Sequence, residues 1–444
     1  MRYRAWVLCA AAVFGPAGGA PAQPKPEAPA GRDPFTDPIF NPPGVAKPVQ
    51  TPPPGKPSAA PDASDPAAAP TLFESLCGAG NWCACSSGYT TWMTAEWVIG
   101  TTRGPSLVPV VTSGPASAGA LAGAIGQPTT VPLFGGRPVL NDWRSGLRAE
   151  AGVWLDPDHR TGISARFYSL FSGTEAFAAR PTGATVINVP QFTPTALGPV
   201  QTPLFVAFPG LTGGTVVAHA RTSFAGGDLN VRRLLDGGTT YRVELLAGYR
   251  QLHLADELGT TFDASTAANP ALAARVSGGD RVRTVNNFYG PQLGLYASAD
   301  WNRFTLEGHA ASALGVTVNE LDFGRTRTLG AAPQVNAAGL IALGVPPATA
   351  AALVPAVRAA TAAPVPLVRT SATDALTYLG VVGEGGGRLS WRATDHLRLT
   401  AGYSFIYWNN VRRAQDVFAS GPALRSRAAD FTTHLFSAGV DFRY

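Results

Sequence analysis

The stretch YRVELLAGYR, residues 241–250, decides the fold class of this protein. Successive side chains of a β-strand point to opposite faces, so every second residue shares a face. One face would carry Tyr241, Val243, Leu245, Ala247 and Tyr249, and the other would carry Arg242, Glu244 and Arg250. A soluble antiparallel sheet produces the same alternation, with its apolar face on a core. The rest of the sequence must therefore decide what the apolar face contacts.

The amino terminus has the features of a secretory signal peptide. It contains two arginines, an apolar run over residues 5–14 and the small-x-small cleavage site Ala20-Pro21-Ala22. The apolar run is too short to cross a bilayer as a helix, which needs about 20 residues. We therefore predict that residues 1–22 are a signal peptide for export through the Sec pathway.

The remaining sequence contains no convincing membrane-spanning helix. The most apolar candidate, residues 337–360, is interrupted by Pro346, Pro347 and Pro355, which favours a short helix inside a loop. Charged residues make up 14% of the chain. Average proteins carry roughly 25%, so this chain has few of the groups that coat a water-exposed surface. If the exported protein is membranous, it must cross the bilayer with strands.

A segment rich in proline and alanine follows the signal peptide. Such a composition cannot bury enough apolar surface to fold, so residues 23–88 are predicted to be a disordered periplasmic linker. Peptidoglycan or partner binding by this linker is the alternative. The linker ends in CGAGNWCAC, and one disulfide is expected among Cys77, Cys83 and Cys85 in an oxidising compartment. Three cysteines without a histidine or a fourth cysteine are an incomplete ligand set, so no metal site is predicted.

Alternation with a period of two recurs ten times after residue 88, and it predicts a domain of membrane strands over residues 89–444. The apolar face of these strands carries no charged residue and is rich in alanine and glycine, with tyrosine and tryptophan at strand ends. Lipid-facing bands with aromatic girdles have this composition, whereas sandwich cores favour larger aliphatic residues. The predicted strands span residues 94–99, 146–156, 162–171, 226–233, 241–252, 288–298, 304–314, 379–392, 397–408 and 434–444.

The opposite face of the same strands collects the charged residues. We predict that these side chains face a polar lumen, where arginine and glutamate rows would pair with one another. The predicted lumen-facing residues are Glu96, Arg148, Glu150, Arg166, Arg242, Glu244, Arg250, Glu307, Arg388, Arg392, Arg398, Asp441 and Arg443, together with Asp228 and Glu384.

The connections alternate between short turns and long segments. Four are tight turns of the kind that Asp, Asn and Gly form, and the other five span residues 100–145, 172–218, 253–285, 315–377 and 409–433. Strict alternation is typical of outer-membrane barrels, whose long loops are extracellular and whose short turns are periplasmic. The sequence therefore predicts an all-β, antiparallel, up-and-down transmembrane barrel of about ten strands, within a range of 8–12, with both termini in the periplasm.

The carboxyl terminus adds an assembly signal. Val440, Phe442 and Tyr444 place apolar and aromatic side chains at alternate positions up to the last residue. This pattern resembles the terminal signal that the barrel assembly machinery of the outer membrane recognises.

Several segments resemble the putative beta-barrel porin seven family of bacterial outer-membrane barrels. They are TAEWVIG near the first strand, VPLFGG with WRSGLRAEAGVWLD, VELLAGYRQLHLADEL, NNFYGPQLGLYAS and TDHLRLTAGYSFIYWNNVRR. The resemblance covers most of the chain from Thr94 to Tyr444. It implies an outer-membrane barrel and supplies no catalytic residues.

The sequence leaves two functions open. A ten-stranded barrel is only slightly wider than the eight-stranded kind that side chains fill. We therefore predict a narrow, porin-like passive channel with long extracellular loops, and the alternative is a closed structural or adhesive scaffold that acts through those loops. No nucleophile-elbow, phosphate-loop or zinc-protease motif is present, and we predict a protein that is not an enzyme and binds no cofactor. The expected partners are outer-membrane lipid, the barrel assembly machinery and either peptidoglycan or an extracellular ligand, but no nucleic acid.

Overall fold

The computed structural model describes residues 91–104, 107–180, 185–195, 198–266, 275–330, 337, 341, 346–360, 365–418 and 428–444. The chain divides into two compact units, Met1–Ser87 and Gly88–Tyr444, and every described residue lies in the second. The predicted signal peptide, the predicted linker and the cysteines Cys77, Cys83 and Cys85 therefore lie outside the described residues.

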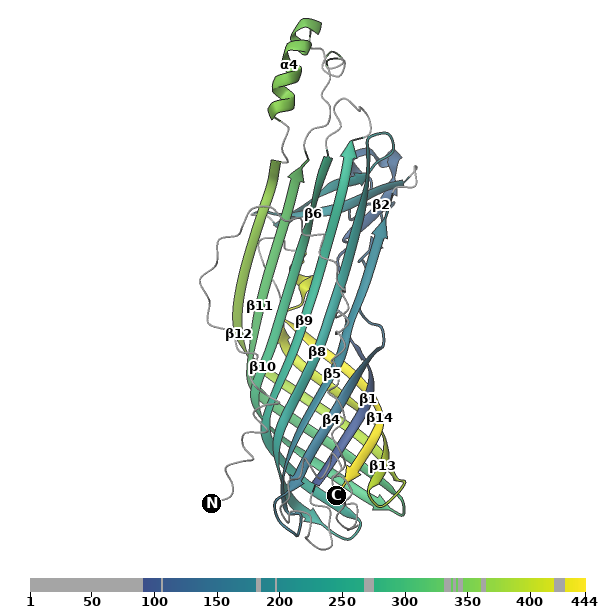
Figure 1. Ribbon diagram of the computed structural model, residues 1–444, viewed down its shortest axis with the longest axis vertical. Coiled ribbons are helices and arrows are strands. Elements are labelled where there is room, and N and C mark those ends of the chain that lie inside the picture. Colours follow the sequence, from purple (N-terminus) through teal and green to yellow (C-terminus); the bar gives the residue numbers. More distant parts are fainter. Residues whose placement is uncertain are drawn as a thin grey trace, which may run out of the picture. The chain divides into compact units, whose positions relative to one another are not determined.

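Ten antiparallel strands close into a barrel, in the order β1-β14-β13-β12-β11-β10-β9-β8-β5-β4 (Figure 1). Each strand predicted from the alternation overlaps one strand of the barrel, so the predicted fold class is confirmed. The strands are β1 Thr91–Thr102, β4 Arg144–Trp154, β5 Thr161–Ala179, β8 Thr212–Gly237, β9 Tyr241–Thr266, β10 Arg275–Trp301, β11 Phe304–Leu329, β12 Val365–Arg392, β13 Leu397–Val411 and β14 Ala429–Arg443.

The first and last strands of the barrel pair with each other and remove the two free edges of the sheet. The backbone N–H groups of Thr91 and Tyr444 each donate to the carbonyl oxygen of the other residue at 2.9 Å. Four short turns lie at this same end, joining β4 to β5, β8 to β9, β10 to β11 and β12 to β13. We call it the short-turn end.

The outward face of the barrel is apolar near the short-turn end. Met93, Trp97 and Ile99 alternate along β1 and are each about half exposed. Aromatic side chains gather at the edges of this apolar band, with Trp301, Trp391 and Phe442 among the exposed ones near the short turns. A band of this kind suits contact with lipid hydrocarbon.

Six strands, β5 and β8–β12, continue well past the ends of the other four (Figure 1). The expectation that residues 172–218, 253–285 and 315–377 are loops is therefore wrong for most of their length. The cause is visible in β9, where the apolar side chains change face after Arg250: Leu252 and Leu254 point inward, while Gln251 and His253 are on the outer face. The alternation continues, but its phase reverses, because water replaces lipid outside.

The prolonged parts of the six strands form a curved sheet, which we call the extension. A second sheet, in the order β3-β2-β6-β7, packs against it through one shared apolar core that includes Val111, Ile187, Phe262 and Phe323. Its strands are β2 Val111–Pro115, β3 Val131–Phe134, β6 Thr185–Thr195 and β7 Gly198–Ala207. The extension comprises residues 173–179, 212–222, 256–266, 275–284, 321–329 and 365–374.

Three short helices complete the described structure. They are η1 Ala116–Leu121, α4 Pro347–Ala360 and α5 Ala414–Phe418. The position of α4 agrees with the short helix expected in residues 337–360. In the part of the chain that the structure describes, no helix has the length and apolarity needed to cross a bilayer.

Candidate functional site in the barrel interior

The inward face of β9 passes through three layers of different chemistry. Glu244 and Arg250 lie nearest the short-turn end, Leu252 and Leu254 follow, and Asp256 comes next, each with an exposed fraction of 0 or 1%. Because neighbouring strands are paired residue by residue, each layer continues around the barrel. We call them the charged layer, the apolar layer and the plug level.

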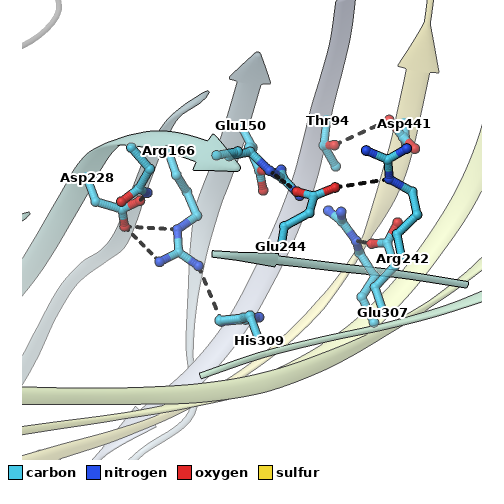
Figure 2. Close-up of polar contacts among 12 residues, drawn as sticks. Thr94, Glu150, Arg166, Asp228, Arg242, Glu244, Glu307, His309 and Asp441 are labelled. Carbon is cyan, nitrogen blue, oxygen red and sulfur yellow. Dashed lines mark hydrogen bonds and ion pairs between the residues drawn. The ribbon is translucent and has the colours of Figure 1, made fainter. Parts of the chain in front are cut away.

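Glu384 on β12 lies at the centre of the charged layer. Its carboxylate accepts hydrogen bonds from Arg166 at 2.8 Å and from Arg250, and it contacts His309 Nε2 at 3.0 Å. Asp228 accepts from the same two arginines, at 2.7 Å from Arg166 and 3.4 Å from Arg250. Figure 2 shows Arg166 pointing toward both Asp228 and His309. Two carboxylates thus share two guanidinium groups across strands that are distant in sequence.

A second set of ion pairs lies closer to the short-turn end. Glu244 accepts from Arg242 Nε at 3.1 Å (Figure 2). It also accepts from Arg232 Nε at 2.7 Å. Glu307 pairs with Arg388 and accepts from Arg443 Nη2 at 3.1 Å. Arg232 also stacks on aromatic rings, with its guanidinium carbon 4.3 Å from the centroid of Tyr296. Each of these carboxylates therefore has at least two arginine partners, which offsets the cost of removing charges from water.

Two small cavities remain within the charged layer. One of about 60 Å³ is lined by Arg166, Asp228 and His309, and one of about 120 Å³ lies nearer the short turns beside Arg242 and Arg443. A water molecule needs at least about 10–15 Å³ of such space, so each cavity has room for several. No group of three His, Cys, Asp or Glu residues in the described ranges is arranged to hold a metal ion. These cavities therefore suit water and small ions.

The apolar layer crosses the barrel above the charged layer. Phe224 on β8 contacts Phe431 on β14 with ring centroids 4.9 Å apart, although these strands are not neighbours in the barrel. Trp408 on β13 contacts Phe431 at 6.4 Å and Phe288 on β10 at 6.2 Å. The rings therefore meet across the interior. The layer consists of Val98, Tyr168, Leu170, Phe224, Leu252, Leu254, Phe288, Ala313, Val382, Ile406, Trp408, Val411, Phe431 and Leu435, all at most 2% exposed.

The chain folds inward after β13 and fills the next level. We call residues 412–418, which contain α5, the plug segment. Arg413 pairs with Asp256 on β9, and both side chains are buried. Arg412 pairs with Asp374 on β12 at 2.8 Å, and its backbone N–H donates to Asn286 Oδ1 at 2.7 Å.

The plug segment is also held in place by its apolar side chains. Ala414, Val417 and Phe418 belong to the apolar core of the extension. Burial raises the pKa of the Asp416 carboxyl, while the nearby Arg413 guanidinium acts in the opposite direction. The plug segment is therefore a docked part of the interior that contacts three barrel strands.

Replacing Arg413 by alanine should release the plug segment. Asp256 would remain buried without its partner, and breaking a buried ion pair in this way costs about 3–5 kcal/mol. We expect a lower free energy of unfolding and fast hydrogen exchange at the Arg412 amide, which is now bonded to Asn286.

The double variant Arg413→Ala, Asp256→Ala is the matched control. It removes both charges, so it should be more stable than the single variant, with a coupling energy in the range of about 0.5–3 kcal/mol for contacting residues. Equal stability of the single and double variants would contradict the role assigned to this pair.

The structure places the residues predicted to face the lumen on the inner side of the barrel strands, and none of them is exposed. Glu96, Arg148, Glu244, Arg250, Glu307, Arg398 and Asp441 are buried, whereas Glu150, Arg166, Arg242, Arg388, Arg392 and Arg443 are half-buried. Among the predicted assembly residues, Val440 is half-buried, Phe442 is exposed on the outer face of β14, and Tyr444, which follows the strand, is exposed.

Several interior residues were missed by the sequence analysis. Arg232 shares the inward parity of Asp228 on β8, so the alternation itself could have identified it. His309 was not among the predicted lumen-facing residues, yet it contacts Glu384. Asp256 and Arg413 lie in segments that were assigned to loops, and no local pattern signals their contact.

Comparison with known proteins places the chain among outer-membrane barrels. The family described as "Putative beta barrel porin-7" matches residues 92–350, which is more than half of the chain. No curated protein matches the chain.

Three solved structures illustrate the likeness in fold. The outer membrane protease OmpT from Escherichia coli is 11% identical, with 81% of this chain and 99% of that chain covered and a TM-score of 0.37. The translocator domain of the autotransporter NalP from Neisseria meningitidis is 11% identical, with coverages of 82% and 90% and a TM-score of 0.26. The CymD monoaromatic hydrocarbon channel is 10% identical, with coverages of 81% and 89% and a TM-score of 0.23.

The likeness to a protease corrects one prediction from the sequence. The absence of catalytic motifs led to the prediction that the chain is not an enzyme, but a barrel that resembles it is a protease. Enzymatic activity is therefore not excluded, and at these low values the likeness extends to the fold and not to a reaction.

The family match covers β4, β5 and β8–β11 in full and all of β1 except Thr91, and with them the strands that carry Arg166, Arg250 and Glu307. It agrees with the resemblance seen in the sequence and with the closed ring of ten strands. The chain belongs to the putative beta barrel porin-7 family of outer-membrane barrels.

Proposed function

We propose that this protein is a closed outer-membrane barrel that holds the extension at the cell surface as a scaffold for contacts outside the cell. In this proposal the short-turn end and both termini face the periplasm. The observation that carries it is the apolar layer, in which Phe224 on β8 contacts Phe431 on β14 and Trp408 on β13 contacts Phe288 on β10, each between strands that are not neighbours. A dry layer of this kind opposes the passage of ions, because ions lose their hydration shell in it.

The plug segment and the charged layer support the same proposal. The plug segment covers the side of the apolar layer that faces the extension, and its Arg413 is held by a buried partner. Most of the inward charges are paired with one another, as Glu384, Glu244 and Glu307 are with arginines, so the role we assign to them is to stabilise the interior and to fix the register of the strands. In this proposal the extension is the part of the protein whose surface outside the membrane is available for contacts.

A narrow passive channel is the second candidate. The two cavities in the charged layer favour it, since they provide polar space lined by Arg166, Arg242 and Arg443 on the periplasmic side. Conduction would require the apolar layer and the plug segment to move aside. Arginine at the cavity walls would then favour anions.

Single-channel recording of the purified, refolded barrel in a planar bilayer distinguishes the two candidates. We expect no discrete conductance steps from the wild-type protein, while heat-modifiable migration in gel electrophoresis shows that the barrel is folded. Discrete steps whose ion selectivity changes in an Arg242→Ala variant would instead support the channel and contradict the closed barrel.

The proposal keeps the partners predicted from the sequence. Val440, Phe442 and Tyr444 are proposed to present the terminal strand to the barrel assembly machinery, and the apolar outer band is proposed to contact lipid. Peptidoglycan binding by residues 23–88 and a ligand outside the cell remain predictions.

A further inference from the structure

One strand of the extension has an unpaired edge. β12 pairs with β11 along its length, but its pairing with β13 begins only at Val382. Residues 365–381 therefore have a strand on one side only, within the part of the chain that the structure describes. Figure 1 shows β12 as the outermost of the long strands.

Two amide side chains show which backbone groups point toward this edge. Asn409 Oδ1 accepts the N–H of Val381 at 2.7 Å, and Asn410 Nδ2 donates to the carbonyl of Leu379 at 2.8 Å. In an antiparallel strand the N–H and C=O of one residue point the same way, and alternate residues point oppositely. The same edge therefore carries the backbone groups of Ser371, Thr373, Ala375 and Thr377, which make no contact with a described residue across it.

The other edge of the extension, on β5, is covered by the chain itself. Arg137 donates to Glu175 at 2.9 Å, the N–H of Leu140 donates to the same carboxylate at 3.2 Å, and Phe134 stacks on Phe177. Natural sheets protect their edges by covering them or with charges, prolines or bulges. The contrast between the two edges indicates that the edge of β12 is kept available.

The sequence of the β12 edge carries little of this protection. Residues 369–380 read RTSATDALTYLG and include no proline or lysine. Arg369 stands at the end of this stretch, and the charged side chain at its centre, Asp374, is engaged by Arg412. The only irregularity in the pairing with β11 lies at Thr328, near the tip. A straight edge with few charges, whose backbone groups contact no described residue, is the arrangement that accepts an added strand.

We propose that the edge formed by residues 369–378 of β12 binds an extended segment of another extracellular polypeptide as an added antiparallel strand. This inference rests on the proposed function, in which the extension lies outside the cell. The small side chains at Ser371, Ala372 and Ala375 favour a partner with alternating threonine or β-branched residues and no charge at its centre. The exposed Leu379 offers an apolar contact at one end.

A second copy in the same membrane is a poorer occupant. Both copies would have the same orientation in the bilayer, so their β12 strands would run in the same direction and could not pair as antiparallel strands. Pairing between copies would need two opposed membranes. The partner is therefore a separate extended chain.

The test uses a fluorescent peptide, Lys-Thr-Val-Thr-Val-Thr-Val-Thr-Val-Thr-Lys, and the full-length protein in detergent or nanodiscs. Ala375→Pro removes an edge-facing N–H and leaves the bonds to β11 in place, because those use the alternate residues. We expect binding at least about tenfold weaker than to the wild type, since strand addition depends on main-chain hydrogen bonds. Ala375→Ser keeps the N–H and should bind as the wild type does.

Two further measurements do not depend on how the proline variant folds. A peptide N-methylated at every second residue along one edge should lose binding to the wild type. Hydrogen exchange at Thr373, Ala375 and Thr377 should be fast in the free protein and slow when the peptide is bound. Equal binding by Ala375→Pro, or slow exchange at these amides without peptide, would overturn the proposal.

The closed barrel and the strand-binding edge can fail separately. Discrete conductance steps from the wild-type protein would contradict the closed-barrel proposal. They would not affect the measurement of peptide binding. If the wild type shows no conductance steps and also binds no peptide, the closed-barrel proposal stands and the proposal of a strand-binding edge is wrong.

Discussion

Replacement of Glu384 by alanine is expected to be the most damaging single change in the barrel. Arg166 and Arg250 would then share Asp228 alone, and Arg250 is fully buried. Removing one partner from a buried ion pair costs about 3–5 kcal/mol, because the remaining charge stays out of water. The free energy of unfolding in urea, followed by tryptophan fluorescence or by heat-modifiable migration, would measure this loss.

Two variants control for this change. Glu384→Gln keeps the shape and some hydrogen bonds, so it should be less harmful than alanine. Glu320→Ala removes an exposed carboxylate from the outer face of β11, and a surface change of this kind usually shifts stability by no more than about 0.5 kcal/mol. If Glu384→Ala and Glu320→Ala had the same stability, the charged layer would not hold the barrel together.

Replacement of Trp408 by alanine should open the apolar layer. Trp408 is fully buried between Phe288 and Phe431, and its Nε1–H donates to Thr317 Oγ1 at 3.0 Å. Loss of a buried tryptophan side chain typically costs about 3–5 kcal/mol. Because the layer is also the seal between the cavities and the plug level, we expect discrete conductance steps that the wild type lacks.

Trp408→Phe is the matched control for the seal. It keeps most of the apolar volume but removes the hydrogen bond to Thr317, so it should lose some stability and remain closed in the bilayer. A folded Trp408→Ala variant without conductance would show that this side chain does not seal the interior, and the plug segment would then be the next barrier to test.

The membrane part of the fold could be predicted because the alternation of apolar and charged residues within each strand is enough to identify that strand. In β9 the alternation of Tyr241, Val243 and Leu245 with Arg242 and Glu244 needs no knowledge of any other strand. Lipid outside and charge inside fix the phase of the alternation. Short turns with Asp, Asn and Gly then fix the connectivity, and the strand count follows.

The same reasoning failed where the surroundings change along one strand. After Arg250 the outer face of β9 meets water and the inner face meets an apolar core. The apolar residues therefore change face, and a search for alternation in one phase places the end of the strand there although the strand continues. The prediction of long loops followed from this change of phase. A search for alternation in either phase would have found the continuation of β8–β11.

The sequence by itself determined the barrel, its strands and the polar character of its inner face, because these depend on the alternation of neighbouring residues. Only the tertiary structure decided that Phe224 meets Phe431, that Arg413 docks on Asp256 and that, among the described strands, β12 is paired on one side only before Val382. These features join positions far apart in the chain, up to 207 residues in the first case. No local pattern encodes which inward side chains meet, because that depends on the closure and width of the barrel.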